Sequence, residues 1–303
     1  MKKSARWAVG MATAVACAVG TGAPALAAAP VTPASATLPV TVQAQSGSST
    51  PTGSDAQLQA DLDALRAALP DGWQASVAAA RAQLGDSSWR AVRDQALAAS
   101  SSGTCAATAL TDYVQQQQAA VTNGVVAAFL AEQGVLDLPA LYALYFETDT
   151  TPQYFGADGG RTTELTHEMR DLKRFWDVNT ADVQLVAMHG DFFDHPEKVA
   201  RVVAVLVGST PQDPHVVGLA TLLSQLVQQA GLDGSPLLTL NASSAPAQPG
   251  PDGVTPPKIV IGDGMLQALD AVGLGDMGPR AVLAHEFSHQ VQFDDGIFDG
   301  THP

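Results

Sequence analysis

One stretch of the chain, A-V-L-A-H-E-F-S-H-Q-V at residues 281–291, constrains the fold and the chemistry more than any other. His285 and His289 are four residues apart, so on an α-helix both imidazoles lie on one face and can reach one cation. Glu286 follows the first histidine, where a water-activating base is expected. The pattern H-E-x-x-H therefore predicts a Zn²⁺ site with His285 and His289 as metal ligands and Glu286 as the catalytic base.

The residues around this pattern predict a helix of about four turns that packs into a core. Pro279 suits a first helical position, and Gly296 suits the position just past a helix end. Glu286 is the only charged residue between Ala281 and Gln292, whereas a surface helix would carry more Lys, Arg or Glu. The apolar residues of this segment are Val282, Leu283, Phe287 and Val291.

The run A-H-E-F-S-H-Q-V-Q-F resembles the motif of the zincin metallopeptidases, and most closely A-H-E-x-G-H-H-V-Q of the bacterial neutral zinc metallopeptidases. The resemblance implies that His285 and His289 bind zinc and that Glu286 is the general base. Ser288 and Gln290 depart from the family, which has Gly and His there, but neither position belongs to the catalytic set. It also implies a zincin-like catalytic core built on this helix and a peptide or protein substrate.

The same resemblance implies a third zinc ligand, a Glu on a later helix, commonly within E-x-x-A-D. No such helix precedes Pro303, so we expect a core that is truncated at its C-terminus and binds metal weakly. Asp295 and His302 are weak alternatives, because Asp295 suits a turn and His302 lies in the terminal tail. His189, which follows a predicted strand, is the first upstream alternative.

The N-terminal residues predict export. Residues 1–27 read as a signal peptide with a basic start, an apolar run and an A-x-A site, and cleavage after Ala27 is expected. An uncleaved anchor or a lipoprotein site before Cys17 are the alternatives. Residues 28–54 carry no charge and are rich in Ala, Pro, Ser and Thr, which predicts a disordered spacer. We therefore expect a secreted, extracytoplasmic protein with no membrane span after cleavage.

The charge of the mature chain excludes one class of partner. Removal of the signal takes 3 of the 15 basic residues and none of the 30 acidic ones, which leaves 12 against 30 and a net charge of −18. Such a chain repels phosphate backbones, so no nucleic-acid binding is expected. Cys105 would be the only cysteine left, either with a missing partner or as a buried thiol.

Apolar periodicity predicts an α+β fold that is mostly helical with a small sheet. Residues 55–149 are expected to form a helical region, with one longer helix over about residues 106–134, and residues 150–303 to form the incomplete metallopeptidase core. In the second region we expect helices at 165–176, 196–207, 216–230 and 264–272, strands at 183–188, 237–241 and 258–261, and an exposed Pro/Gly-rich excursion at 243–257.

Together these observations predict a secreted zinc-dependent metallopeptidase-like protein. A first alternative is a non-catalytic binding or interaction protein of the cell envelope, which would hold no stoichiometric zinc. A second is a zinc hydrolase that acts on a substrate other than peptides. The sequence does not indicate an oligomeric state or a substrate preference.

Overall fold

The structure is a computed structural model that describes residues 53–84, 88–97, 108–156, 158–176 and 180–297. The chain divides into two units, residues 1–60 and 61–303, and of the first only the beginning of helix α1 (Gly53–Ala68) is described. The predicted signal peptide, most of the predicted spacer, Cys105 and His302 lie outside the described residues. The fold described below is that of residues 61–303.

The described part of residues 61–149 is helical, as the sequence predicts. It comprises the end of α1, then α2 (Trp73–Gln83), α3 (Ser88–Leu97), α4 (Ala109–Ala119), α5 (Gly124–Glu132), the 3₁₀ turn η2 (Val135–Asp137) and α6 (Leu138–Phe146). The single helix expected over residues 106–134 is wrong, because α4 and α5 are separate. Asn123 begins α5 by accepting the Val126 N–H with its side chain at 3.1 Å, a cap that a continuous helix would not need.

The remaining residues hold the sheet and the other helices. They comprise α7 (Thr162–Phe175), β1 (Gln184–Met188), η3 (Gly190–Asp194), α8 (Pro196–Val207), α9 (Pro214–Gln229), η4 (Pro236–Thr239), β2 (Ala242–Ala245), β3 (Gln248–Gly250), β4 (Gly253–Thr255), β5 (Lys258–Gly262), α10 (Asp263–Ala271) and α11 (Gly278–Asp294). The helices expected at 165–176, 196–207, 216–230 and 264–272 are confirmed, as are the strands at 183–188 and 258–261.

One expectation in this region is wrong and a second holds only in part. Residues 237–241 were expected to form a strand, but Pro236 begins the 3₁₀ turn η4 and the Ser235 hydroxyl caps the Leu237 N–H at 3.3 Å. The strand is β2, which overlaps the start of the stretch expected to be exposed and has all four residues buried, whereas residues 246–254 are exposed or half-buried as expected. Its sequence A-S-S-A carries no apolar alternation, so packing against neighbouring elements determines its conformation.

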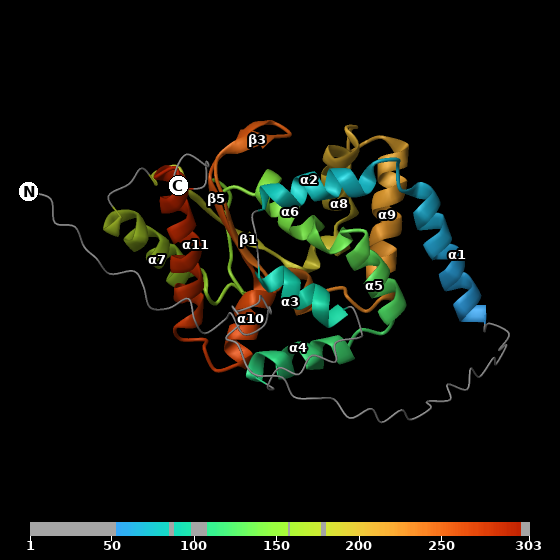
Figure 1. The fold of residues 1–303 in the computed structure, drawn as a ribbon, viewed down its shortest axis with the longest axis horizontal. Coiled ribbons are helices and arrows are strands. Elements are labelled where there is room, and N and C mark those ends of the chain that lie inside the picture. The colour runs from blue at the N-terminus through green and yellow to red at the C-terminus, as the bar shows by residue number, and fades with distance from the viewer. Residues whose placement is uncertain (1–52, 85–87, 98–107, 157, 177–179, 298–303) are drawn as a thin grey trace, which may run out of the picture. The chain divides into compact units, whose positions relative to one another are not determined.

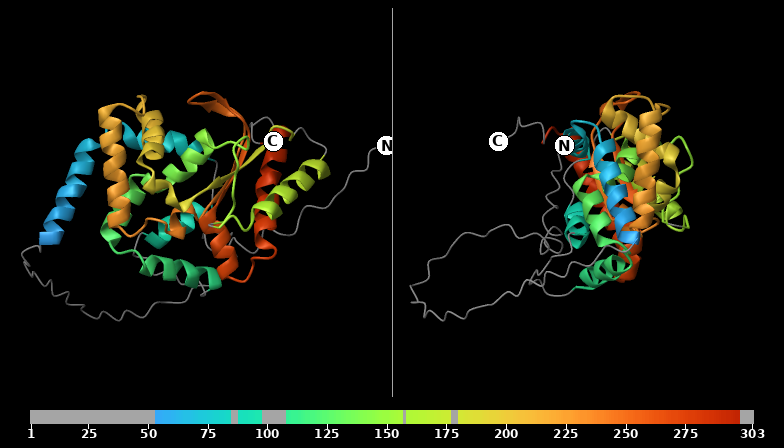
Figure 2. Two further views of the ribbon diagram at one scale, coloured as in Figure 1. Left: turned by 180° about the vertical axis from the view of Figure 1, so that it is seen from behind. Right: turned by 90° about the vertical axis from the view of Figure 1, so that its right-hand side faces the viewer.

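The sheet has three strands in the order β1-β5-β2, and β3 pairs with β4 in a separate hairpin. The central strand β5 pairs in parallel with β1, with Met188 opposite Gly262, and antiparallel with β2, with Ala242 opposite Ile261. Helices α7 and α11 lie on one side of β1 and β5, and α6 and α8 lie on the other (Figures 1 and 2). The fold is therefore mostly helical with a small mixed sheet, which confirms the α+β class.

The space between the sheet and the pair α7 and α11 is filled by an apolar core. From α11 it receives Leu283, Phe287 and Val291, which recur every four residues and form one stripe of the helix. Burial of each side chain contributes on the order of 2 kcal/mol. The other members of this cluster are Phe155, Leu165, Met169, Val183, Leu185, Ala187, Ile259, Ile261 and Leu266.

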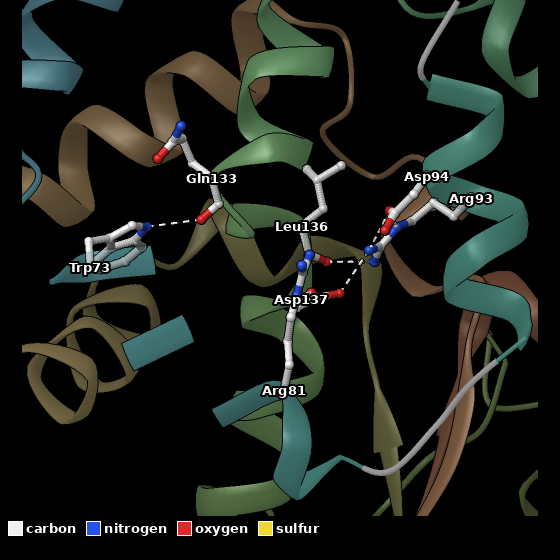
Figure 3. A network of polar contacts seen from close by, with 7 residues as sticks. All are labelled: Trp73, Arg81, Arg93, Asp94, Gln133, Leu136 and Asp137. Carbon is white, nitrogen blue, oxygen red and sulfur yellow. Dashed lines mark hydrogen bonds and ion pairs between the residues drawn. The ribbon is translucent and has the colours of Figure 1, made fainter. Parts of the chain in front are cut away.

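A buried ionic network connects α2 and α3 to the corner between η2 and α6 (Figure 3). The Asp137 carboxylate is 0% exposed and accepts hydrogen bonds from Arg93 Nη2 at 2.8 Å and from Arg81 Nε. Arg93 also donates to the Leu136 carbonyl at 3.0 Å and to Asp94 at 2.7 Å. Burial alone would raise the pKa of Asp137, but the two guanidinium groups outweigh it and hold that pKa below its ordinary value.

The outer edge of β1 is occupied by one side chain. The Ala187 N–H of this edge donates to Gln153 Oε1 at 2.9 Å, where a further strand would otherwise place its carbonyl. The Gln153 amide nitrogen in turn donates to Glu147 Oε2 and to the Thr148 carbonyl, both at 3.0 Å. Gln153 is therefore held by both ends against the edge of the sheet.

Lys258 connects the central strand to the end of α6. Its side chain is buried, and its ammonium donates to the carbonyls of Leu144, at 2.6 Å, and of Glu147, which the last turn of a helix leaves unpaired. Burial lowers the pKa of the Lys258 ammonium to about 8. The last turn of α6 is thereby attached to β5.

The described helices are short or polar for membrane spans. No single helix in this part of the chain is long and apolar enough to cross a membrane. Helix α5 and the segment Val135–Phe146 meet these criteria only together, across a bend of 75°.

Candidate metal centre

The motif lies on helix α11, close to the bounds that the sequence predicts. The helix runs from Gly278 to Asp294, with Pro279 in its first turn. Gly296 follows its end with a φ of 68°, a left-handed conformation that favours glycine. His285 and His289 therefore lie on one helix face, as their spacing requires.

The rotation of α11 about its axis decides which motif residues face the sheet. Glu286 and Gln290 are 6% and 4% exposed and lie on the inner face, one helical turn apart. His285 is exposed and His289 is half-buried, so the two imidazoles lie toward the outer side of the helix.

One side chain fixes that rotation. Gln290 Nε2 lies within hydrogen-bonding distance of Ser244 Oγ at 2.7 Å, the Ala245 carbonyl at 3.0 Å and the Lys258 carbonyl at 3.1 Å. These acceptors belong to β2 and β5, so the buried amide fastens the motif helix to two strands. The sequence marked Gln290 only as a departure from the family pattern.

The two imidazoles converge at their outer nitrogens. Nε2 of His285 and Nε2 of His289 are 3.3 Å apart, and the two ring planes are inclined at 88°. Two nitrogen ligands about 2.0–2.1 Å from a tetrahedral Zn²⁺ would stand about 3.3 Å from each other. The spacing of this pair therefore fits two of the positions around one zinc ion.

The electrostatics of the motif suit neutral imidazoles and a carboxyl group that can exchange a proton near neutral pH. Burial raises the pKa of the Glu286 carboxyl to about 7, and no described donor hydrogen-bonds to it. Partial burial of its ring, and then the proximity of His289, lower the pKa of His285. At neutral pH the His285 ring is thus uncharged, as metal binding requires.

The described residues do not complete a metal site. No group of three or more His, Cys, Asp or Glu side chains in this part of the chain is placed to hold a metal ion. Asp295 caps the C-terminal end of α11 and is exposed. His189 lies elsewhere, with its Nδ1 at 2.9 Å from Asp263 Oδ2 and its ring stacked on Tyr154 at 3.8 Å.

Two polar pairs near these sites were not predicted from the sequence. His289 Nδ1 lies 2.9 Å from Gln292 Oε1, three residues further along α11. The pair of His189 and Asp263 forms because these residues directly follow Met188 and Gly262, which are partners in the parallel register. The spacing of three within a helix could have indicated the first pair, whereas the second depends on strand pairing across 74 residues.

The chain was compared with models of protein families, with curated proteins and with solved structures, and none of them matches it.

Proposed function

We propose that this protein is an exported, zinc-dependent metallopeptidase-like hydrolase whose centre is the motif on α11. The observation that carries the proposal is the 3.3 Å separation of the His285 and His289 Nε2 atoms, on the helix that also carries the buried carboxyl of Glu286. Two converging imidazoles and an adjacent base form the chemical set of metal-assisted hydrolysis.

In this proposal each residue has one task. His285 and His289 would hold Zn²⁺ through Nε2, and a bound ion would supply Lewis acidity toward water and the scissile carbonyl. Glu286 accepts the proton of the attacking water and delivers it to the leaving amine. A carboxyl group whose pKa is raised to about 7 is suited to both transfers near neutral pH, because it is neither too weak a base nor too weak an acid.

The arrangement around the motif supports the finer fold proposal, a zincin-like core. Strand β5, helix α10 and helix α11 follow one another along the chain, and α11 packs against β5 and β2 through its apolar stripe and Gln290. The resemblance of the motif supports a peptide or protein substrate, and the acidic composition argues against nucleic acid as a partner.

Zinc content and proteolysis test the proposal together. Bound zinc per chain is measured after dialysis against a zinc buffer, and cleavage of casein is followed in parallel. His285→Ala and His289→Ala should abolish bound zinc, whereas Glu286→Gln should retain zinc and lose cleavage. His167→Ala is the matched control, because His167 is exposed on α7 and should change neither result. Cleavage that persists in both His285→Ala and Glu286→Gln would refute the assignment.

A non-catalytic binding protein is the second candidate. It is favoured by the finding that no group of three metal-binding side chains gathers within the described residues. Under this alternative the chain holds no stoichiometric zinc, and a chelator leaves its melting temperature unchanged. A zinc hydrolase that acts on other substrates would share the zinc result and would differ only in a substrate profile.

A further inference from the structure

We propose that Gln292 is a positioning residue that fixes the tautomer of His289 and presents its Nε2 atom to the metal. This inference deepens the proposed function and rests on it. It concerns a residue outside the H-E-x-x-H pattern, and it follows from hydrogen-bond geometry along one face of α11.

The carbonyl oxygen of the Gln292 side chain determines which nitrogen of His289 carries the proton. Oε1 of Gln292 lies 2.9 Å from Nδ1 of His289. An amide oxygen only accepts hydrogen bonds, so Nδ1 must be the donor. A neutral imidazole protonated at Nδ1 has its lone pair at Nε2, which is the atom that faces His285. Gln292 thus selects the tautomer that can bind a metal through Nε2.

The contact between the two histidines also determines which nitrogen of His285 carries the proton. Nε2 of His285 lies 3.3 Å from Nε2 of His289. Because His289 can only accept at that atom, His285 must donate from its own Nε2. In the metal-free protein the protons therefore point one way, from His285 to His289 and from His289 to Gln292. Binding of zinc requires His285 to move its proton to Nδ1, whereas His289 is already in the required form.

The two histidines therefore differ before zinc binds: His289 already has the tautomer that zinc binding requires, and His285 does not. Among the described residues His289 has an orienting acceptor at Nδ1, and no acceptor for Nδ1 of His285 occurs in the same part of the chain. Partners of this kind typically change metal affinity by about 10–100-fold, because they fix the ring and its tautomer before the metal arrives. Loss of the Gln292 oxygen should therefore weaken binding through His289, although Gln292 never contacts the ion.

Tautomers and zinc affinity are measured separately in wild type, Gln292→Leu, Gln292→Glu and Asp294→Asn. Nitrogen-15 NMR of the metal-free protein, at a pH where both rings are neutral, should show His289 protonated at Nδ1 and His285 at Nε2. Gln292→Leu should give mixed tautomers at His289 and a zinc Kd about 10–100-fold higher. Gln292→Glu keeps an acceptor oxygen and should preserve the tautomer and the affinity within a few-fold. Asp294→Asn is the exposed control on the same helix and should change neither.

The possible results separate this inference from the proposed function. If His289 carries its proton on Nε2 in the wild type, or if Gln292→Leu binds zinc as tightly as the wild type, the inference is overturned while the zinc site stands. If the wild type binds no zinc, the proposed function fails and the metal-presenting role of Gln292 fails with it, whichever tautomer NMR reports. A Kd that rises in Gln292→Leu and recovers in Gln292→Glu, together with the tautomer change, supports both.

Discussion

Replacement of Asp137 by Asn removes the charge at the centre of the buried network and nearly preserves its shape. The Asp137 side chain is fully buried, and Arg93, 2% exposed, is left without its buried counter-charge in the variant. Removal of one partner of a buried ion pair costs about 3–5 kcal/mol, because the other charge stays desolvated. Arg93 keeps the Leu136 carbonyl and the partly exposed Asp94 as partners, so we expect the lower end, about 3 kcal/mol.

Urea unfolding of the full chain, followed by circular dichroism, measures this loss of unfolding free energy, and thermal unfolding measures the accompanying shift in melting temperature. A change of 1 kcal/mol shifts the melting temperature of a unit of this size by about 2–4 °C, so the expected shift is about 6–12 °C. Asp63→Asn is the matched control: Asp63 accepts from Arg66 at 2.7 Å, but the two side chains are 61% and 50% exposed. Its loss should stay below about 1 kcal/mol.

The pH dependence follows from the lowered pKa of Asp137. A carboxyl group whose folded pKa lies below its unfolded value of about 3.9 stabilises the fold above that value and loses this effect as the pH falls further. The difference in free energy of unfolding between the wild type and Asp137→Asn should therefore be constant from about pH 5 to 7 and become smaller below about pH 4. Equal losses for Asp137→Asn and Asp63→Asn, or a gap that grows in acid, would refute the reasoning.

Three further substitutions test other parts of the structure. Lys258 has a folded pKa of about 8 against about 10.4 when unfolded. The free energy of unfolding of the wild type relative to Lys258→Met should therefore rise by about 3 kcal/mol between these two pH values. Urea titrations across this range measure the difference, and a difference that does not change with pH would contradict the prediction. Gln290→Ala should destabilise the fold by about 1–3 kcal/mol in thermal unfolding, because its acceptors on β2 and β5 lose a buried donor. Gln292→Ala, on the solvent side of α11, should lose clearly less stability. Gly262→Ala should lower the stability of the fold by about 1–3 kcal/mol, because a Cβ there would lie 2.0 Å from the Thr239 carbonyl oxygen. Gly218→Ala, with open space around it in α9, should be neutral or stabilising. Equal effects of the two substitutions in thermal unfolding would show that the contact at Gly262 is not tight.

The sequence predicted what depends on neighbours along the chain. The four-residue spacing of His285 and His289 determines their common helix face once the helix forms, and Pro279 and Gly296 mark its ends. The regular helices of the second half and strands β1 and β5 were predicted for the same reason, because their apolar periodicity is local. The burial of Glu286 and the hydrogen bonds of Gln290 could not be predicted, since both depend on where β2 and β5 lie.

The remaining features depend on contacts between distant residues. Asp is a residue type usually found in surface turns. Asp137 is instead buried, because Arg81 and Arg93, 56 and 44 residues away, donate hydrogen bonds to its carboxylate. Strand β2 is built from small residues with no alternating pattern, so only its pairing with β5 identifies it. The break between α4 and α5 depends similarly on the Ala230 carbonyl, which accepts the N–H groups of Thr122 and Asn123.

The Gln153 side chain has a consequence for self-association. An edge strand with unpaired amides can recruit a strand from another molecule, and this is how many sheets polymerise. The amide that Ala187 would offer to an incoming chain is already satisfied within the molecule. Extension of the sheet past β1 would first have to displace Gln153, and in doing so it would break the hydrogen bonds of Gln153 to Glu147 and Thr148.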